Sequence, residues 1–252
     1  MRLKGKRAIV TGGASGFGEG IVRKFAAEGA SVLIADLNLE AGQQLADQLC
    51  NEMQATVKAI ATNVADDQSV QQMKDAAIEQ LGGVDILVNN AGTTHLPTLM
   101  EDVTDTDFDK VFAVNCKSVY LAARHFVPVF KRQGQGTILN IASTAAVSPR
   151  PKLSWYNASK GWMNTATKSM AVELAPEGIR VNAVNPVAGE TPLLQKFMGK
   201  DTPEIREKFL STIPLGRFST PSDMANAACY LCSDEAAMVT GLCMEVDGGR
   251  CI

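Results

Sequence analysis

The sequence predicts an α/β fold built on a parallel sheet. Short runs rich in β-branched residues alternate along the 252 residues with longer segments whose apolar residues have helical spacing. Hydrophobic residues make up 46% of the chain, and neither a Pro/Ser-rich linker nor an internal repeat interrupts it. We therefore expect one domain covering residues 1–252. Because right-handed crossovers join parallel strands, helices should cover both faces of the sheet.

Seven strands are predicted, and the first six are expected to form one doubly wound, mostly parallel sheet with the seventh added at an edge. The expected strands are Arg7–Thr11, Ser31–Ala35, Thr56–Ala61, Asp85–Asn89, Gly136–Ala142, Arg180–Val184 and Leu242–Val246. The clearest helical segments between them are Gly18–Glu28, Leu39–Asn51, Asp67–Leu81, Asp105–Lys131 and Ser159–Ala175.

The longest stretch without a predicted strand runs from Asn185 to Thr240. Its first part mixes apolar and charged residues around Pro and Gly. A long insertion after a strand end is typical of a binding element, so we interpret residues about 188–217 as a substrate lid. A surface helical hairpin without a role in binding is the alternative.

Charge and cysteine content narrow the functional classes. The 24 basic and 27 acidic residues give a net charge of −3 without a basic cluster, which argues against a nucleic-acid partner. The amino-terminal apolar run is too short for a secretory signal or a membrane span, so we expect a cytoplasmic protein without a membrane partner. The six scattered cysteines are interpreted as reduced thiols, and the Cys229/Cys232 pair as core packing rather than a metal or redox site. No metal is expected.

A glycine-rich turn follows the first strand in the segment TGGASGFG. Gly12 suits the tight turn, Gly16 lets the backbone approach a pyrophosphate, and Gly18 permits close packing of the helix. The amino terminus of that helix offers unpaired N–H groups to an anion. The spacing G-x-x-x-G-x-G differs from the commoner G-x-G-x-x-G, but the physical mechanism is the same. The turn predicts dinucleotide binding in a Rossmann-type fold.

A carboxylate at the end of the second strand indicates which dinucleotide is bound. Asp36 can accept hydrogen bonds from both hydroxyls of an adenosine ribose and would repel a 2′-phosphate. Ser15, Phe17 and Leu37 stand where a basic residue could neutralise such a phosphate. Both observations favour NAD over NADP.

Tyr156 and Lys160 are four residues apart, which places them about one turn apart on one helix face. A neighbouring ammonium favours the phenolate, so Lys160 is expected to lower the pKa of Tyr156 from about 10 toward the range useful for proton transfer. An ordinary helix surface is the alternative. The glycine turn and Ser143 make it the weaker interpretation.

Several short motifs occur together in an order typical of one enzyme family. They are Thr11–Gly18, Asn89–Gly92, Asn115, Ser143, Tyr156–Lys160, Asn185–Pro186, Thr191 and Asp247–Gly249. Over essentially its whole length the chain resembles the short-chain dehydrogenase/reductase family in its NAD-dependent form. The resemblance implies that Ser143 donates a hydrogen bond to the substrate oxygen, that Tyr156 is the acid/base, and that Lys160 adjusts its pKa and contacts the nicotinamide ribose. It also implies that Asn115 completes a proton relay through a water and that the protein is a homotetramer.

The glycine turn and the resemblance together imply a set of cofactor-binding residues. They are Gly12, Ser15, Gly16, Phe17, Gly18, Asp36, Asn63, Val64, Asn90, Ala91, Gly92, Tyr156, Lys160, Pro186, Val187 and Thr191. Val187 departs from the family pattern, which usually has Gly after that Pro, and its side chain is expected to alter the nicotinamide seat or narrow the pocket.

The substrate is predicted less closely than the cofactor. Parts of the chain around residues 93–95, 148–155 and 188–191 resemble a subgroup similar to the formylbenzenesulfonate dehydrogenases, which implies a small aromatic alcohol or carbonyl substrate. The side chains expected around it are His95, Ser143, Trp155, Leu193 and Phe197, with Leu194 and Met198 beside them. Arg150 and Lys152 could attract an anionic group of the substrate, or could simply be solvated. The alternatives are an oxoacyl thioester or sugar/diol dehydrogenase of the same family, and a noncatalytic NAD-binding regulatory protein.

Overall fold

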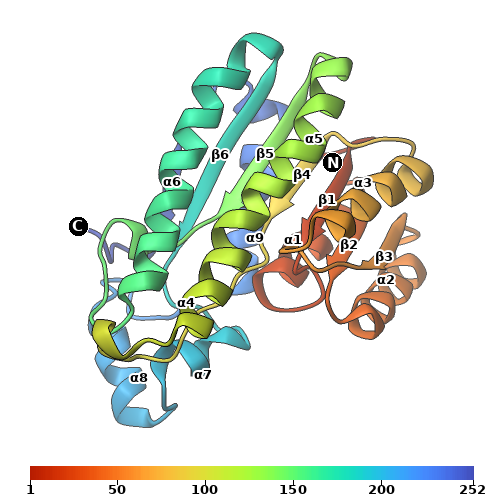
Figure 1. Ribbon diagram of the computed structural model, residues 1–252. Helices are drawn as coiled ribbons and strands as arrows, with labels where there is room; N and C mark the ends of the chain where they lie inside the picture. The colour runs from red at the N-terminus through yellow and green to blue at the C-terminus, as the bar shows by residue number, and fades with distance from the viewer.

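The computed structural model describes residues 1–252 as one seven-stranded sheet with helices on both faces (Figure 1). The strand order is β3-β2-β1-β4-β5-β6-β7, and every neighbouring pair is parallel. The strands are β1 (Arg7–Thr11), β2 (Ser31–Asp36), β3 (Val57–Ala61), β4 (Ile86–Asn89), β5 (Gly136–Ile141), β6 (Ile179–Pro186) and β7 (Cys243–Val246). The predicted fold and all seven strands are confirmed, with β7 at an edge.

Nine α-helices accompany the sheet. They are α1 (Gly16–Ala27), α2 (Leu39–Met53), α3 (Asp67–Leu81), α4 (Asp105–Phe112), α5 (Ser118–Gln133), α6 (Ser154–Leu174), α7 (Leu193–Met198), α8 (Pro203–Leu210) and α9 (Pro221–Cys232). The predicted helix Asp105–Lys131 is two helices, because a π-helical turn at Ala113–Lys117 separates α4 from α5. The helix α6 begins five residues before the predicted Ser159, so Tyr156 lies in its first turn.

Two apolar layers enclose the sheet, and β2 shows how one strand contributes to both. Its Val32 and Ile34 belong to the core cluster formed with α1, α2 and α9, whereas Leu33 and Ala35 belong to the cluster formed with α3, α5 and α6. All four side chains are fully buried. Successive strand residues point to opposite faces, so a sheet covered on both faces needs an unbroken apolar run.

The topology defines a crevice at the carboxyl ends of the strands. Chain connections run outward from β1 toward β3 on one side and from β4 toward β7 on the other, so the order reverses between β1 and β4. Ligands of open parallel sheets bind at such a reversal. The helices α7 and α8 lie together at one end of the molecule, shown in blue at the lower left of Figure 1. The segment that carries them is closed at its base by a bridge between Gly189 and Ser219.

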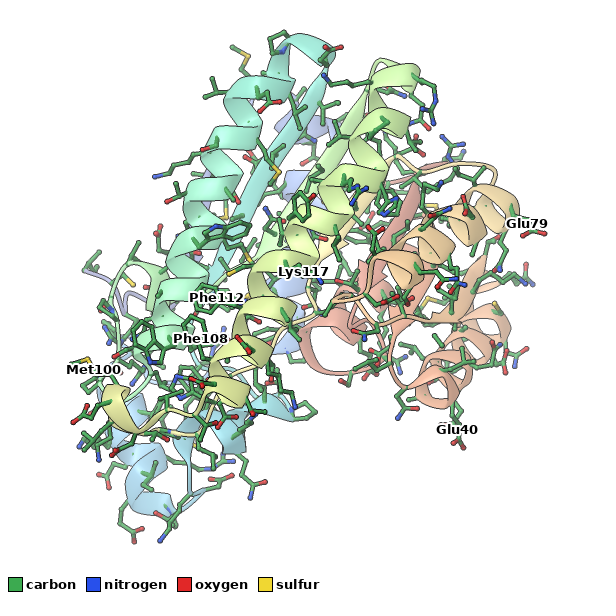
Figure 2. The ribbon with its side chains drawn as sticks, viewed as in Figure 1. Glu40, Glu79, Met100, Phe108, Phe112 and Lys117 are labelled. Carbon is green, nitrogen blue, oxygen red and sulfur yellow. The ribbon has the colours of Figure 1, made fainter.

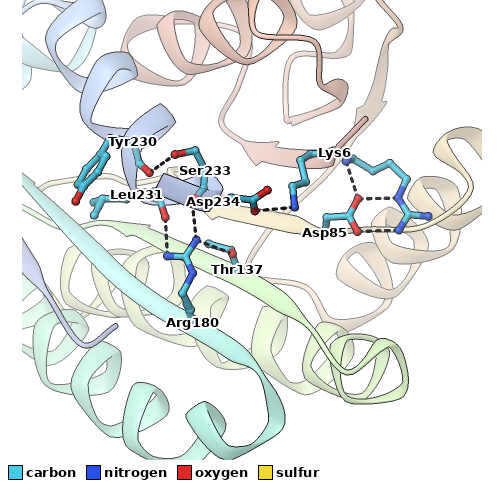
Figure 3. Close-up of polar contacts among 9 residues, drawn as sticks. Lys6, Asp85, Thr137, Arg180, Tyr230, Leu231, Ser233 and Asp234 are labelled. Carbon is cyan, nitrogen blue, oxygen red and sulfur yellow. Dashed lines mark hydrogen bonds and ion pairs between the residues drawn. The ribbon is translucent and has the colours of Figure 1, made fainter. Parts of the chain in front are cut away.

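At the opposite, amino-terminal ends of the strands, here called the amino-terminal edge of the sheet, lies a half-buried guanidinium (Figure 3). Arg180, in β6, donates hydrogen bonds to Leu231 O at 2.8 Å and Val239 O at 3.2 Å. It also donates to Thr137 Oγ1 at 3.3 Å and Ser233 O at 3.2 Å. These bonds tie the end of α9 to the sheet.

Two ion pairs lie beside this guanidinium in the same view (Figure 3). Arg7 Nε donates to Asp85 Oδ2 at 2.8 Å, and Lys6 Nζ donates to Asp234 Oδ1 at 3.0 Å. The charged groups at this edge therefore have partners within the chain.

The six cysteines are free thiols, as expected. Cys229 and Cys232 are both buried in the core cluster under α9, which confirms that this pair packs in the core. No three His, Cys, Asp or Glu side chains come together in a group that could hold a metal ion. None of the helices combines the length and apolar character needed to cross a membrane.

Candidate active site

A cleft of about 400 Å³ lies at the carboxyl ends of the strands, between the glycine turn and α7. Most of the predicted cofactor residues line it: Gly12, Ser15, Gly16, Phe17, Asp36, Asn90, Ala91, Gly92, Tyr156, Lys160, Pro186, Val187 and Thr191. Of the predicted substrate residues, Ser143, Leu193 and Phe197 also line it. Gly18, Asn63, Val64, His95 and Trp155 lie outside its lining.

The glycine turn is held in place by the side chain of Asn90. The Nδ2 group of Asn90 donates to Thr11 O and Gly12 O, both at 2.9 Å. Gly12 has φ +60°, a backbone conformation that favours glycine. Gly18 supports the turn from below: a Cβ there would lie 2.0 Å from Gly12 O, so it permits close packing as predicted although it does not line the cleft.

The amino terminus of α1 is open to the cleft. Ser15, its N-cap residue, makes no side-chain capping bond, whereas side chains cap α2, α3, α4 and α9. The first N–H groups of a helix need an acceptor and carry a partial positive charge. The turn can therefore accept an anionic group.

The carboxylate of Asp36 is fixed at the other end of the cleft. Its Oδ2 accepts a hydrogen bond from Ala14 N at 3.0 Å, and its Oδ1 accepts one from Asn38 N at 2.9 Å. These bonds join the end of β2 to the glycine turn. The predicted neighbours Asn63 and Val64 follow β3 next to Asp36, where the Asn63 side chain accepts from Ala65 N at 3.1 Å rather than lining the cleft.

Ser143, Tyr156 and Lys160 meet at the base of the cleft, and each is at most 6% exposed. The Ser143 hydroxyl accepts from Ala145 N at 3.1 Å, and its place beside Tyr156 favours the ionised form of that phenol. Lys160 Nζ lies 6.0 Å from the centre of the Tyr156 ring. The sequence spacing therefore correctly brings these three side chains together.

Asn115 is fully buried in the π-helical turn beside this group. Its Oδ1 accepts from Thr93 N at 2.9 Å, while its Nδ2 donates to Thr93 O at 2.9 Å and to Ser159 Oγ at 3.0 Å. The π-helical turn interrupts the regular hydrogen bonding of the helix at this residue. The amide joins the loop after β4 to α6.

The electrostatics of Tyr156 and Lys160 are dominated by burial. Burial raises the pKa of the Tyr156 phenol, and the hydrogen bond from Ser143 only partly opposes it. Burial also lowers the pKa of Lys160 to about 8. The pKa of Tyr156 is thus raised, whereas the helical spacing predicted that Lys160 would lower it, and the Lys160 ammonium donates a hydrogen bond to Ile141 O at 2.9 Å.

Two side chains expected around the substrate point elsewhere. Trp155 precedes Tyr156 on α6 and is turned away from it, since consecutive helical residues face different directions. Its indole N–H donates to Met100 O at 3.1 Å, and its ring meets Phe108 edge-on at 5.5 Å. Figure 2 labels Phe108 on α4 and Met100 in the turn that precedes this helix, at the left of the view. His95 is 1% exposed, with its Nδ1 2.7 Å from Leu96 O.

The segment that carries α7 and α8 shares a small apolar core with the unusual Val187 at the end of β6. Val187, Leu194, Met198, Ile213 and Phe218 form this cluster. The added side chain at Val187 thus joins the end of β6 to α7 and also lines the cleft. Sequence reasoning missed Lys196, a cation in the cleft lining, although its place in α7 beside Phe197 was a usable signal.

Comparison with known proteins decides the family. The family model described as enoyl-(acyl carrier protein) reductase matches residues 12–250. The chain belongs to the short-chain dehydrogenase/reductase family. It is 50% identical to 4-formylbenzenesulfonate dehydrogenase of Comamonas testosteroni over 99% of both chains.

Solved structures of this family superpose closely on the chain. A 3-ketoacyl-(acyl-carrier-protein) reductase from Brucella melitensis, complexed with NADH, has a TM-score of 0.93 and 46% identity, covering 99% of this chain and all of the other. A 7α-hydroxysteroid dehydrogenase complexed with NADH and 7-oxoglycochenodeoxycholic acid also has a TM-score of 0.93, with 36% identity over 98% of this chain and 95% of the other. The chain is thus an oxidoreductase of a family whose members reduce or oxidise very different molecules.

Proposed function

We propose that the protein is an NAD-dependent dehydrogenase/reductase that interconverts a small alcohol and its carbonyl compound, with an aromatic compound as the preferred substrate. The observation that carries this proposal is the meeting of Ser143, Tyr156 and Lys160 at the base of a cleft whose other end is formed by Asp36. The enzymes that the chain resembles most among those described above are a dehydrogenase and a reductase, which supports the same reaction class.

The residues present fit a nicotinamide dinucleotide. The uncapped amino terminus of α1 suits the pyrophosphate, and the fixed carboxylate of Asp36 suits a ribose with free hydroxyls. Asn90, Ala91 and Gly92 offer backbone along the middle of the cleft, with Pro186, Val187 and Thr191 toward its catalytic end. When bound, the nicotinamide supplies the position that gains or loses a hydride.

The protein's own residues then handle the proton. In the proposed reaction the Ser143 hydroxyl donates a hydrogen bond to the substrate oxygen, and Tyr156 exchanges a proton with it at its hydroxyl. Lys160 needs a new geometry for its predicted role, because its ammonium must turn from Ile141 O toward the phenol and the nicotinamide ribose. The Asn115 amide bonds to Thr93 in the loop after β4 and to Ser159 of α6. In the proposed reaction, these bonds hold in place the relay that passes protons from Lys160 to water.

In this proposal, residues 188–217 form a lid over the substrate, because Leu193 and Phe197 of α7 already line the cleft.

We also propose a homotetramer located in the cytoplasm. The family resemblance supports the homotetramer, and the six free thiols support a cytoplasmic enzyme. Light scattering of the purified protein tests the assembly, and a stable monomer would contradict it. Cell fractionation tests the location.

A panel of alcohols with NAD⁺ and NADP⁺, and of aldehydes with NADH and NADPH, tests the proposed reaction by the absorbance of the reduced coenzyme. We expect turnover of benzyl alcohols and benzaldehydes with a preference for NAD. The Asp36→Ala variant should lose about 10- to 100-fold of that preference, because it no longer binds the ribose or repels a 2′-phosphate. If Asp36→Ala discriminated between NAD and NADP as the wild type does, Asp36 would not set the cofactor preference.

A second candidate function is the reduction of an oxoacyl thioester. The likeness to the Brucella melitensis reductase favours it, because that enzyme is complexed with NADH. Comparing an acetoacetyl thioester with benzaldehyde, both with NADH, separates the two functions. A higher kcat/KM for the thioester than for benzaldehyde would show that oxoacyl thioesters, rather than aromatic compounds, are the preferred substrates.

A further inference from the structure

We infer that Arg150, backed by Arg250, binds an anionic group at the end of the substrate remote from the reacting carbonyl. The inference rests on the proposed function and adds to it a substrate class: aromatic aldehydes and alcohols that carry a carboxylate or sulfonate on the ring. Arg150 lies in the loop between β5 and α6, six residues before Tyr156.

The first argument is that both guanidinium groups lack an anionic partner. No carboxylate pairs with either one, and Arg150 Nη2 and Arg250 Nε are buried nitrogens without a hydrogen-bond acceptor. Arg250 makes only a neutral contact, from Nη1 to Ser148 Oγ at 2.8 Å. An unmet buried donor costs about 1–3 kcal/mol, and more when it is charged. An anion that reaches these nitrogens would remove that cost.

The second argument is electrostatic. Burial and the neighbouring charge of Arg250 lower the pKa of Arg150 to about 10. The group is still cationic at neutral pH, so two positive charges face each other without compensation. Such a pair attracts a single anion more strongly than an isolated surface cation does, because part of the solvation of both groups is already lost.

The third argument is position. A row of three aromatic rings, Tyr156, Phe197 and Phe209, leads from the catalytic hydroxyl to Arg150. The ring centres are 5.4 Å apart for Tyr156 and Phe197 and 6.2 Å apart for Phe197 and Phe209. The Arg150 guanidinium carbon lies 4.2 Å from the centre of the Phe209 ring. Phe197 lines the cleft, whereas Phe209 and Arg150 lie just outside its lining. A substrate with its carbonyl at Tyr156 and its ring along Phe197 would therefore have to extend past Phe197 to bring its far end to Arg150.

Lys152 shows why the effect is assigned to Arg150 alone. Both cations were candidates for anion binding from the sequence, and they are two residues apart. The Lys152 side chain is exposed, and its backbone has φ +64°, which directs this residue into the outward turn of the loop. Its charge is solvated and needs no partner. Lys152 therefore provides a matched control of the same charge in the same loop.

The experiment compares benzaldehyde with 4-carboxybenzaldehyde and 4-formylbenzenesulfonate, using NADH consumption. The wild-type enzyme should have a kcat/KM at least tenfold higher for the two anionic aldehydes. In Arg150→Gln we expect this value to fall about 10- to 100-fold for both anionic aldehydes, mainly through KM, and to stay within about twofold for benzaldehyde. Lys152→Asn should behave as the wild type with all three. Arg150→Lys should recover part of the loss, because it keeps the charge without the planar fork.

Two further controls separate the possible failures. Phe209→Leu removes the ring under the guanidinium but keeps both charges, so it should change the kcat/KM for all three aldehydes by a similar factor. Calorimetric titration with benzoate and benzenesulfonate measures anion binding without turnover. Arg150→Gln should raise the Kd of both anions by about the same factor as it lowers the kcat/KM for the anionic aldehydes. Equal rates of the wild type on neutral and anionic aldehydes, or equal losses in Arg150→Gln on all three, would overturn the inference. Absence of turnover with any aldehyde or alcohol would instead contradict the proposed function, while the titration still decides whether Arg150 binds an anion.

Discussion

The cations at the amino-terminal and carboxyl-terminal edges of the sheet differ in how completely they are bonded within the chain. At the amino-terminal edge, Arg180 donates to three carbonyls and a hydroxyl, and Lys6 and Arg7 each face a carboxylate. At the carboxyl-terminal edge, Lys160 has one backbone acceptor, and Arg150 has a buried nitrogen with none. Partners within the chain stabilise the first edge. The second edge leaves its cations available to molecules from outside.

The difference shows where stability and function separate in this fold. Completing the bonds of a buried cation stabilises the folded chain, whereas an incomplete set lowers stability until a ligand arrives. Substitutions at the amino-terminal edge should therefore change unfolding and leave turnover unchanged. Substitutions at the carboxyl-terminal edge should lower turnover without lowering stability, and four variants test this comparison.

The largest effect is expected for Tyr156→Phe, which removes the hydroxyl that exchanges the proton. Turnover should fall about 10³-fold, within the usual range for loss of a general acid/base. Binding of NADH, followed by its fluorescence, should weaken far less than turnover, because the other cofactor-binding residues remain in place. Tyr120→Phe is the matched control, since Tyr120 is 55% exposed on α5. Turnover that survives in Tyr156→Phe would contradict the proposed chemistry.

Arg180→Met should give the largest loss of stability at the amino-terminal edge. It leaves the carbonyl of Leu231 without its donor, whereas Ser233 O keeps the bond from Ala236 N and Val239 O keeps the bond from Asn182 Nδ2. The free energy of unfolding should therefore fall by about 1–3 kcal/mol. Urea unfolding measures this change. The kcat/KM of the folded variant should match that of the wild type, and a selective loss of activity would break the comparison between the two edges.

Lys160→Met should have the opposite effect on stability, although it removes a proposed catalytic group. Its pKa falls from near 10.5 to about 8 on folding, so the unfolded chain binds more protons than the folded chain between these values. Stability of the wild type therefore rises with pH across that window, and the full penalty of burial applies below it. We expect the variant to be about 1–3 kcal/mol more stable at pH 7, after allowing for the lost bond to Ile141 O.

Urea unfolding of both proteins at pH 7 and pH 10 checks this expectation. The difference between them should shrink at the higher pH. A variant that is less stable than the wild type at pH 7 would show that the buried ammonium already has adequate partners in the chain.

Asp234→Asn should have the smallest effect. The carboxylate pairs with Lys6 Nζ at 3.0 Å, but its side chain is 84% exposed. Exposed ion pairs contribute little because water and salt screen them, so the free energy of unfolding should change by less than about 0.5 kcal/mol. The same urea measurement tests it at low and high salt. A change as large as that of Arg180→Met would show that the amino-terminal edge acts as one network.

The sequence predicted the parts of this molecule that depend on regular spacing. The parallel sheet follows from alternating apolar runs, and the meeting of Tyr156 with Lys160 follows from the helical repeat. The partners of Arg180 could not be predicted in this way, because most are backbone carbonyls, which every residue has. The state of Lys160 was missed for the same reason, since its acceptor is the carbonyl of Ile141. Trp155 was assigned to the substrate by its place next to Tyr156, although neighbours on a helix face different sides.

The bridge between Gly189 and Ser219 has a consequence for how this architecture diversifies. Hydrogen bonds from Glu190 N to Ser219 O and from Ser219 N to Ala188 O hold the two ends of the intervening segment together at 2.9 and 3.1 Å. Once those ends are joined, doubling the length between them costs only about 0.6 kcal/mol of closure entropy. The segment can therefore be lengthened, shortened or exchanged as a module without disturbing the strands. New specificities can arise there while the rest of the enzyme stays the same.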